Sequence, residues 1–139
     1  IELNKPNFSV KLLPLICYEI IYSGNIFDNR NFDFIVNISE DGWFGQSLGP
    51  HQHFAHSIFR AIESGKYVLR SANNGITAIV NPLGVVEKQV DLGKSGYVDL
   101  TDSKKIKPTI FSKYGNIIFV LIILLYISLI FSFNKTKNE

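Results

Sequence analysis

The sequence lacks several features that would assign its class at once. It has no methionine and a single cysteine, and its 139 residues begin at Ile1. One cysteine excludes a disulfide within the chain, so Cys17 is either a small buried hydrophobic residue or a reactive thiol. The length allows one domain at most. Because a complete reading frame starts with methionine, we expect this chain to be the C-terminal part of a longer protein.

The sequence also has little excess of either positive or negative charge. The 14 lysines and arginines nearly balance the 12 acidic residues, which leaves a net charge of +2. The charges are scattered and form no basic stripe, so we expect no nucleic-acid partner. There is no HExxH motif, and no cysteine near His51, His53 and His56 completes a zinc site. We therefore expect no metal and no cofactor.

One long apolar run is present near the C-terminus. Ile117–Phe133 contains no charge and no proline, and with its extension back to Tyr114 it reaches the ~20 residues that cross a bilayer core. The alternative, a buried helix of a soluble protein, should show a polar face, but the run contains only Ser128 and Ser132 as polar side chains. We expect a transmembrane helix at 114–133.

The remaining patterns predict a layered α/β domain over residues 1–100, followed by a polar linker at 101–113. A polar tail follows the apolar run at 134–139. Residues 50–64 show helical spacing of apolar side chains, with Pro50 at the start and Gly65 as the stop. Strands are expected at 10–16, 32–38, 66–72, 75–81, 85–90 and 96–100.

Cys17 stands where the first of these strands ends, and Tyr18-Glu19 follow it. A nucleophile on a tight turn after a strand is exposed above the sheet, and the next backbone N–H, here that of Tyr18, can face a developing oxyanion. Glu19 either orients the site or holds a structural hydrogen bond. The alternative is a core cysteine beside a surface glutamate.

Two connecting segments are candidates for ligand contacts. The stretch 39–49 has three glycines and the pair Trp43-Phe44. Trp43 either completes the core or meets an apolar partner outside it. Asn73-Asn74-Gly75 has the composition of a tight turn between strands, and such turns often line sites. Arg60 and Glu63, one helical turn apart, are expected to form an ion pair.

Several of these segments together resemble a known family. LLPLICYEII is similar to the nucleophile segment of the carbon–nitrogen hydrolase, or nitrilase, superfamily. The motifs DGWFG, GPHQH, RAIE and RSANNGIT, followed by a Pro-x-Gly turn, resemble apolipoprotein N-acyltransferases. These enzymes also carry a membrane span after this domain. The resemblance extends from Val10 to Phe133.

The resemblance implies the C-terminal part of a four-layer α-β-β-α sandwich and a Glu-Lys-Cys triad. Cys17 would be the nucleophile, with Tyr18 as backbone oxyanion donor and Glu19 in support. We expect Trp43, Phe44 and Asn73 to bind substrate. The acyl donor would be a phospholipid and the acceptor an apolipoprotein. The protein would lie in the bacterial inner membrane with its globular part in the periplasm.

The sequence departs from that family in two respects. The family's glutamate and lysine lie well before the cysteine, whereas only sixteen residues precede Cys17 here. Glu40 stands where these enzymes more often have asparagine. Two alternatives therefore stay open: a membrane-anchored nitrilase-like amidase, and a non-catalytic remnant of a split gene.

Overall fold

The computed structural model describes residues 1–5, 8–24, 31–104, 106–107 and 109–137. Its elements, in chain order, are β1 (Glu2–Lys5), β2 (Phe8–Ile16), the 3-10 helix η1 (Cys17–Ile21), β3 (Phe34–Glu40), the 3-10 helix η2 (Gly42–Phe44), α1 (Gly49–Ser64), β4 (Tyr67–Asn73), β5 (Thr77–Val80), β6 (Val86–Val90), α2 (Ile110–Tyr114) and α3 (Ile117–Lys137). The expected helix at 50–64 and the first five expected strands are confirmed, with ends shifted by a few residues.

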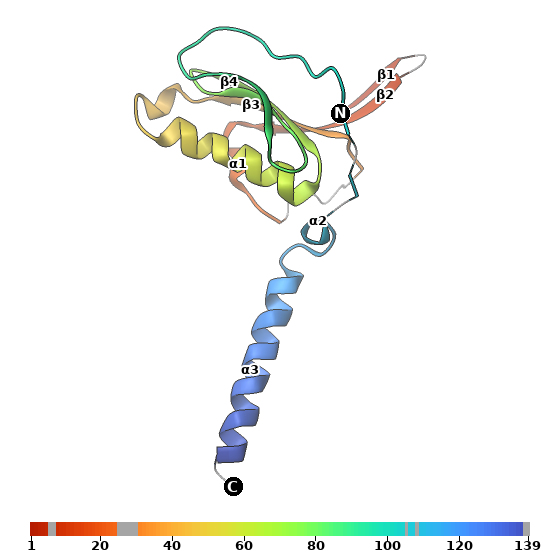
Figure 1. Cartoon of the computed structure of the whole chain (residues 1–139), viewed down its shortest axis with the longest axis vertical. Helices are drawn as coiled ribbons and strands as arrows, with labels where there is room; N and C mark the ends of the chain where they lie inside the picture. Colours follow the sequence, from red (N-terminus) through yellow and green to blue (C-terminus); the bar gives the residue numbers. More distant parts are fainter. Residues whose placement is uncertain (6–7, 25–30, 105, 108, 138–139) are drawn as a thin grey trace.

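The six strands form one mixed sheet in the order β1-β2-β3-β4-β5-β6 (Figure 1). The central strands β2, β3 and β4 are parallel, and the outer pairings are antiparallel. In this register Ile16 pairs with Ile38, and Glu40 pairs with Asn73. The carboxyl ends of β2, β3 and β4 therefore meet at one edge of the sheet, where open α/β sheets bind their ligands.

Helix α1 covers one face of the sheet (Figure 1). On β3 the side chains of Ile35, Asn37 and Ser39 are buried, in alternation with more exposed neighbours such as Ile38. The core joins apolar residues of this face, including Ile35, to Phe54 and Ala61 of α1. Asn37 and Ser39 continue the same inward row, so polar groups enter the interior toward the carboxyl end of the strand.

The opposite face of the sheet stays partly open. Ile16 and Ile38 are 55% and 53% exposed although both are apolar strand residues. The segment after β6 crosses part of this face, because Val98 and Leu100 line a cavity of about 290 Å³ together with Val36 of β3. The strand expected at 96–100 is therefore wrong: this segment lies over the sheet face rather than hydrogen-bonded along an edge. Strand β1, which pairs with β2, was not expected.

The ends of α1 follow the sequence signals. Pro50 occupies the first turn, where its missing N–H costs nothing. Gly65 ends the helix in the left-handed conformation with φ +67°, and its N–H donates to the carbonyl of Ala61 at 2.9 Å. Glycine adopts this conformation without steric cost.

The C-terminal part consists of two helices. Helix α2 begins in the expected linker 101–113, of which residues 105 and 108 lie outside the described residues, and Thr109 caps it by accepting from the N–H of Ser112. It ends at Tyr114, so the single helix expected at 114–133 is interrupted before α3 begins at Ile117. Helix α3 extends away from the sheet (Figure 1). No helix within the described residues combines the length and the apolar character that crossing a membrane requires. Residues 138–139 of the expected polar tail lie outside the described residues.

Candidate functional site

Cys17 lies at the carboxyl edge of the sheet, where β2 has ended and η1 begins. Its backbone is in the left-handed region, with φ +47°, a conformation that non-glycine residues rarely adopt and that concentrates at functional sites. The turn leaves the side chain half-buried. The geometry is that of a strand–turn–helix nucleophile, in which a strained turn lifts the reactive atom above the sheet.

Two oxygen atoms after the middle of β3 lie beside the sulfur. Ser39 Oγ is 3.8 Å from Cys17 Sγ, and the carbonyl oxygen of Glu40 is 3.9 Å from it. Among the described residues, no lysine or glutamate side chain is within hydrogen-bond distance of the sulfur. The thiol is therefore held by the neighbouring strand rather than by an adjacent charged side chain.

A buried ion pair lies beneath Ser39. Asp41 Oδ2 accepts from Arg70 Nη2 at 2.7 Å, and both side chains are fully buried. Asp41 Oδ1 accepts from Ser39 Oγ at 2.7 Å and contacts His53 Nδ1 at 2.9 Å. Because a carboxylate only accepts, the proton of this imidazole lies on Nδ1. Burial raises the pKa of Asp41, but the Ser39 hydrogen bond and the Arg70 charge outweigh it and hold this pKa below its usual value.

The ion pair is also connected to the backbone carbonyl of Cys17, through Asn37. Arg70 Nη1 donates to Asn37 Oδ1. The amide nitrogen of Asn37 donates in turn to the carbonyl of Leu15 at 2.9 Å and to that of Cys17 at 3.3 Å. Hydrogen bonds thus run from the Cys17 carbonyl through Asn37, Arg70, Asp41 and Ser39 to the Cys17 sulfur. We call these residues, together with His53 on Asp41, the buried polar network. Burial strengthens its hydrogen bonds and makes its members costly to lose.

Glu19 and Tyr18 lie on η1, directly after the cysteine. Glu19 Oε2 accepts from the N–H of Ile16 at 2.6 Å, so this carboxylate fixes the start of the turn. The ring of Tyr18 is 53% exposed and stacks on His53 with centroids 5.1 Å apart. Its backbone N–H belongs to the first turn of a 3-10 helix, where N–H groups have no acceptor within the helix.

The two neighbouring aromatic residues Trp43 and Phe44 differ in their surroundings: the first faces solvent and the second packs on other rings. Trp43 is 87% exposed, so it does not complete the core of this chain. The ring of Phe44 faces inward, with its centroid 5.7 Å from that of His53 and 6.3 Å from that of Tyr18. Gly49 admits this ring, because a Cβ there would lie 2.5 Å from Phe44 Cδ1.

Asn73 is held by Glu40 rather than directed at the sulfur. The amides of Asn73 and Asn74 both donate to the Glu40 carboxylate, which also accepts from the N–H of Gly42 at 2.7 Å. These hydrogen bonds, that of Asn73 first, lower the pKa of Glu40. The glutamate therefore ties the loop after β3 to the turn after β4.

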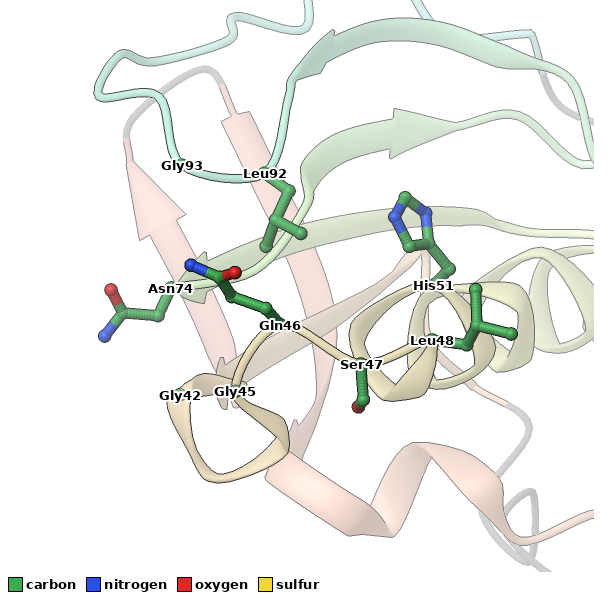
Figure 2. Close-up of a pocket in the computed structure, with 9 residues that line it drawn as sticks. All are labelled: Gly42, Gly45, Gln46, Ser47, Leu48, His51, Asn74, Leu92 and Gly93. Atoms are coloured by element: carbon green, nitrogen blue, oxygen red, sulfur yellow. The ribbon is translucent and has the colours of Figure 1, made fainter.

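A pocket of about 960 Å³ opens beside Gly42 and Asn74, two of the residues that Glu40 binds. Figure 2 shows Gln46 of the loop and Leu92 of the turn after β6 directed toward each other across it. Its lining consists of Gly42, Gly45, Gln46, Ser47, Leu48, His51, Asn74, Leu92 and Gly93. Cys17 does not line it, so this pocket adjoins the candidate site without containing the thiol.

The three histidines all lie on α1, but their side chains have different neighbours. His53 belongs to the buried polar network, whereas His51 faces the pocket. Burial lowers the pKa of His56. Within the part of the chain that the structure describes, no group of three His, Cys, Asp or Glu side chains is arranged for a metal ion.

A second polar cluster links α1 to the segment after η1. The expected ion pair is confirmed, with Arg60 Nη2 2.9 Å from Glu63 Oε1. Arg60 also donates to the carbonyls of Ile21 and Tyr22, and Ser23 Oγ donates to Glu63. Burial lowers the pKa of Arg60 and raises that of Glu63. This cluster fixes the far end of the turn that begins at Cys17.

The members of the buried polar network other than Cys17 were missed from the sequence: Asn37, Ser39, Asp41, His53 and Arg70. A signal was present, since Asn37 and Ser39 stand at the inward positions of an otherwise apolar strand. Buried polar side chains need partners. Arg70, in the middle of the neighbouring strand, was a second such signal, because a buried arginine needs a carboxylate such as Asp41.

Residues 4–104 match the carbon-nitrogen hydrolase family. The chain is 48% identical over 118 residues to an apolipoprotein N-acyltransferase of Rickettsia bellii (strain RML369-C), a match that covers 84% of this chain and 24% of that protein. It is 44% identical over 132 residues to an apolipoprotein N-acyltransferase of Rickettsia typhi (strain ATCC VR-144 / Wilmington), with 89% and 27% covered. The chain thus spans about a quarter of the length of these curated relatives.

Proposed function

Because the chain belongs to the carbon-nitrogen hydrolase family, we propose that it is part of an acyltransferase whose nucleophile is Cys17. The relatives it matches over most of its length are named apolipoprotein N-acyltransferases. The proposed reaction moves an acyl chain from a phospholipid to Cys17 as a thioester. The acyl group then passes from Cys17 to the α-amino group of the N-terminal diacylglyceryl-cysteine of an apolipoprotein.

The observation that carries this proposal is the backbone of Cys17. A left-handed turn at the carboxyl end of a parallel strand presents the sulfur, and a 3-10 helix begins at the same residue. We assign the N–H of Tyr18, the next residue, to the oxyanion that forms when the sulfur attacks a carbonyl carbon. One oriented backbone donor at an oxyanion is worth about 10²- to 10³-fold in rate. Glu19 supports this geometry by holding the N–H of Ile16.

In the first step the thiolate forms a bond to the ester carbonyl carbon of the phospholipid. The carbonyl electron pair moves to oxygen, and its return expels the lysophospholipid alkoxide, which takes up a proton. In the second step the amine nitrogen forms a bond to the thioester carbonyl carbon, the Cys17 thiolate leaves with the bonding pair of the C–S bond, and the nitrogen proton returns to the sulfur through the general base. The family's glutamate would take the thiol proton and its lysine would meet the oxyanion. We propose that both come from the remainder of the protein.

The lipid side of the site is assigned to the loop after β3. Trp43 is exposed although it is the largest apolar side chain of the loop, which suits contact with an acyl chain. Phe44 packs inward against Tyr18, so it supports the loop from beneath. Asn73 acts at this site through Glu40, whose carboxylate it binds.

We propose that α3 anchors the chain in the bacterial inner membrane. The described apolar side chains of Ile117–Phe133 are largely exposed, and contiguous exposed apolar surface marks a site of contact with a membrane or a protein. More lysines precede this run than follow it, which by charge alone would place the globular part in the cytoplasm. Large domains escape that rule, and we assign the globular part to the periplasm.

The open sheet face suits the layered fold of the family. Ile16 and Ile38 are apolar and more than half exposed, and burial of such side chains is worth about 25 cal/mol per Å². We propose that a second sheet from the remainder of the protein packs on this face, which would complete an α-β-β-α sandwich. A small-amide hydrolase has no use for the exposed Trp43 or for α3, so neither feature favours the amidase alternative.

The test is thioester formation on Cys17 in the complete protein. Incubation with phospholipid vesicles should add one acyl mass to the peptide containing Cys17, removable by hydroxylamine. Cys17→Ser should abolish this product, because an alkoxide is far harder to generate than a thiolate. The 139-residue chain alone should form none. Full acylation of the serine variant would show that another residue is the nucleophile, and transfer by the chain alone would refute the division of the triad.

A further inference from the structure

Ser39 has one hydroxyl proton and two neighbours that compete for it. Asp41 Oδ1 is 2.7 Å from Ser39 Oγ, and Cys17 Sγ is 3.8 Å from it. A hydroxyl donates a single hydrogen bond, and an ionised carboxylate donates none. The proton therefore points either to the carboxylate or to the sulfur.

The protonation state of the cysteine decides between these two orientations. A thiol can donate toward the Glu40 carbonyl, 3.9 Å away, so the Ser39 proton is free to remain on Asp41. A thiolate only accepts, and the same carbonyl oxygen then faces it without a proton between them. Ser39 is 6% exposed and Cys17 is half-buried, so the hydroxyl meets the sulfur from the protein interior. Among the described residues, the Ser39 hydroxyl is the hydrogen-bond donor to this sulfur.

Asp41 keeps two other hydrogen-bond donors when the Ser39 proton turns away from it. Its carboxylate keeps Arg70 Nη2 at 2.7 Å and His53 Nδ1 at 2.9 Å. The carboxylate is also fixed in place from the side of Gly75, where there is no room even for a Cβ. Loss of one donor among three therefore leaves the buried carboxylate paired and immobile.

We propose that Ser39 stabilises the ionised form of Cys17 by turning its hydroxyl proton from Asp41 to the sulfur. Ser39 is thus a positioning residue for the nucleophile, and this deepens the proposed function by naming what sustains the thiolate. The charged and titratable groups around the sulfur are Tyr18 and Glu19 on η1, Glu40 at the end of β3, Asp41 directly after it, His53 on α1 and Arg70 on β4.

The experiment measures thiol ionisation directly in the 139-residue chain, purified in detergent. The rate of alkylation by iodoacetamide is followed from about pH 5 to pH 10, since only the thiolate reacts. A bond forms between sulfur and the methylene carbon, iodide leaves with the bonding pair, and water or buffer takes the thiol proton. Cys17 is the single cysteine, so the signal has one source.

Three variants give the comparison. Ser39→Ala should raise the midpoint by about one unit, or tenfold less thiolate below it, because it removes a hydrogen bond to a charged group. Ser39→Thr keeps the hydroxyl and should keep the midpoint. Ser71→Ala is the matched control: it removes an exposed hydroxyl from the next strand and should change nothing.

A Ser39→Ala midpoint within about 0.3 units of the parent, or an equal shift in Ser71→Ala, would overturn the proposal. Thermal unfolding is measured on each variant. If Ser39→Ala does not fold, Ser39→Thr decides: an unchanged midpoint supports the role of the hydroxyl and a raised midpoint refutes it. The assay involves no acyl transfer, so failure of the proposed acyltransferase reaction would leave this result standing.

Discussion

Replacing Asp41 with asparagine should be among the most destabilising single changes in the chain. The substitution keeps the shape of the side chain and removes its charge. Arg70 then remains as a fully buried cation without a counterion, although Asn37 and the carbonyl of Ile76 still accept from it. An unpaired buried charge is costly because water cannot reach it.

The size of the effect follows from this burial. Removing one partner of a buried ion pair costs about 3–5 kcal/mol, against a total stability of about 5–15 kcal/mol for a domain. For a domain of about 100 residues this lowers the melting temperature by about 12 °C or more. The double variant Asp41→Leu, Arg70→Met should recover much of the loss, since both charges are then absent.

The assay is thermal unfolding in detergent, with Asp91→Asn as control. Asp91 Oδ2 lies 2.9 Å from Lys94 Nζ, but these side chains are 50% and 69% exposed. Exposed pairs contribute about 0–1 kcal/mol. A loss below about 1 kcal/mol in Asp41→Asn, or equal losses in the two variants, would show that the buried pair is not what stabilises the carboxyl edge of the sheet.

Acid should reproduce the Asp41→Asn effect in the parent chain. The pKa of Asp41 is below its ordinary value of 3.8 in the folded chain. A lowered carboxyl pKa contributes stability that is complete above the unfolded value of about 3.9 and is lost as pH falls through the folded value. The difference in melting temperature between parent and variant should therefore be constant near neutral pH and shrink below about pH 4.

Two further predictions concern the lipid side and the membrane. Trp43→Ala in the complete enzyme should slow thioester formation by about ten- to hundredfold, from loss of ~1–3 kcal/mol of acyl-chain contact, with an unchanged melting temperature; a large melting shift with normal acylation would contradict it. A reporter fused to the C-terminal end should be active in the cytoplasm, and a periplasmic signal would reverse the proposed orientation.

The sequence predicted the elements that depend on local patterns. The Pro50 start and Gly65 stop of α1 and the strand ending at Cys17 are confirmed, because caps and alternation act over a few residues. Residues 96–100 also have a strand-like composition, yet they cross a sheet face. Strand formation requires a free edge to pair with, and composition carries no information on which edge is free.

The candidate site was predicted only in part for a related reason. Cys17, Tyr18 and Glu19 are contiguous, so one motif marked them. Single hydrogen bonds of the buried polar network join residues up to 33 positions apart, as between Asn37 and Arg70. Its pairing depends on parallel register between β3 and β4, which places Asn37 opposite Arg70. No local pattern specifies that register.

Gly75 shows how a correct prediction can rest on an incomplete reason. The sequence Asn73-Asn74-Gly75 indicated a turn whose residues tolerate positive φ. Asn74 adopts that conformation, with φ +52°, whereas Gly75 is not among the glycines with positive φ. The glycine is needed because a Cβ there would overlap the Asp41 carboxylate. The turn residue thus serves the buried ion pair: any side chain at position 75 would push Asp41 away from Ser39 and Arg70, and with them disturb both hydrogen-bonded approaches to Cys17.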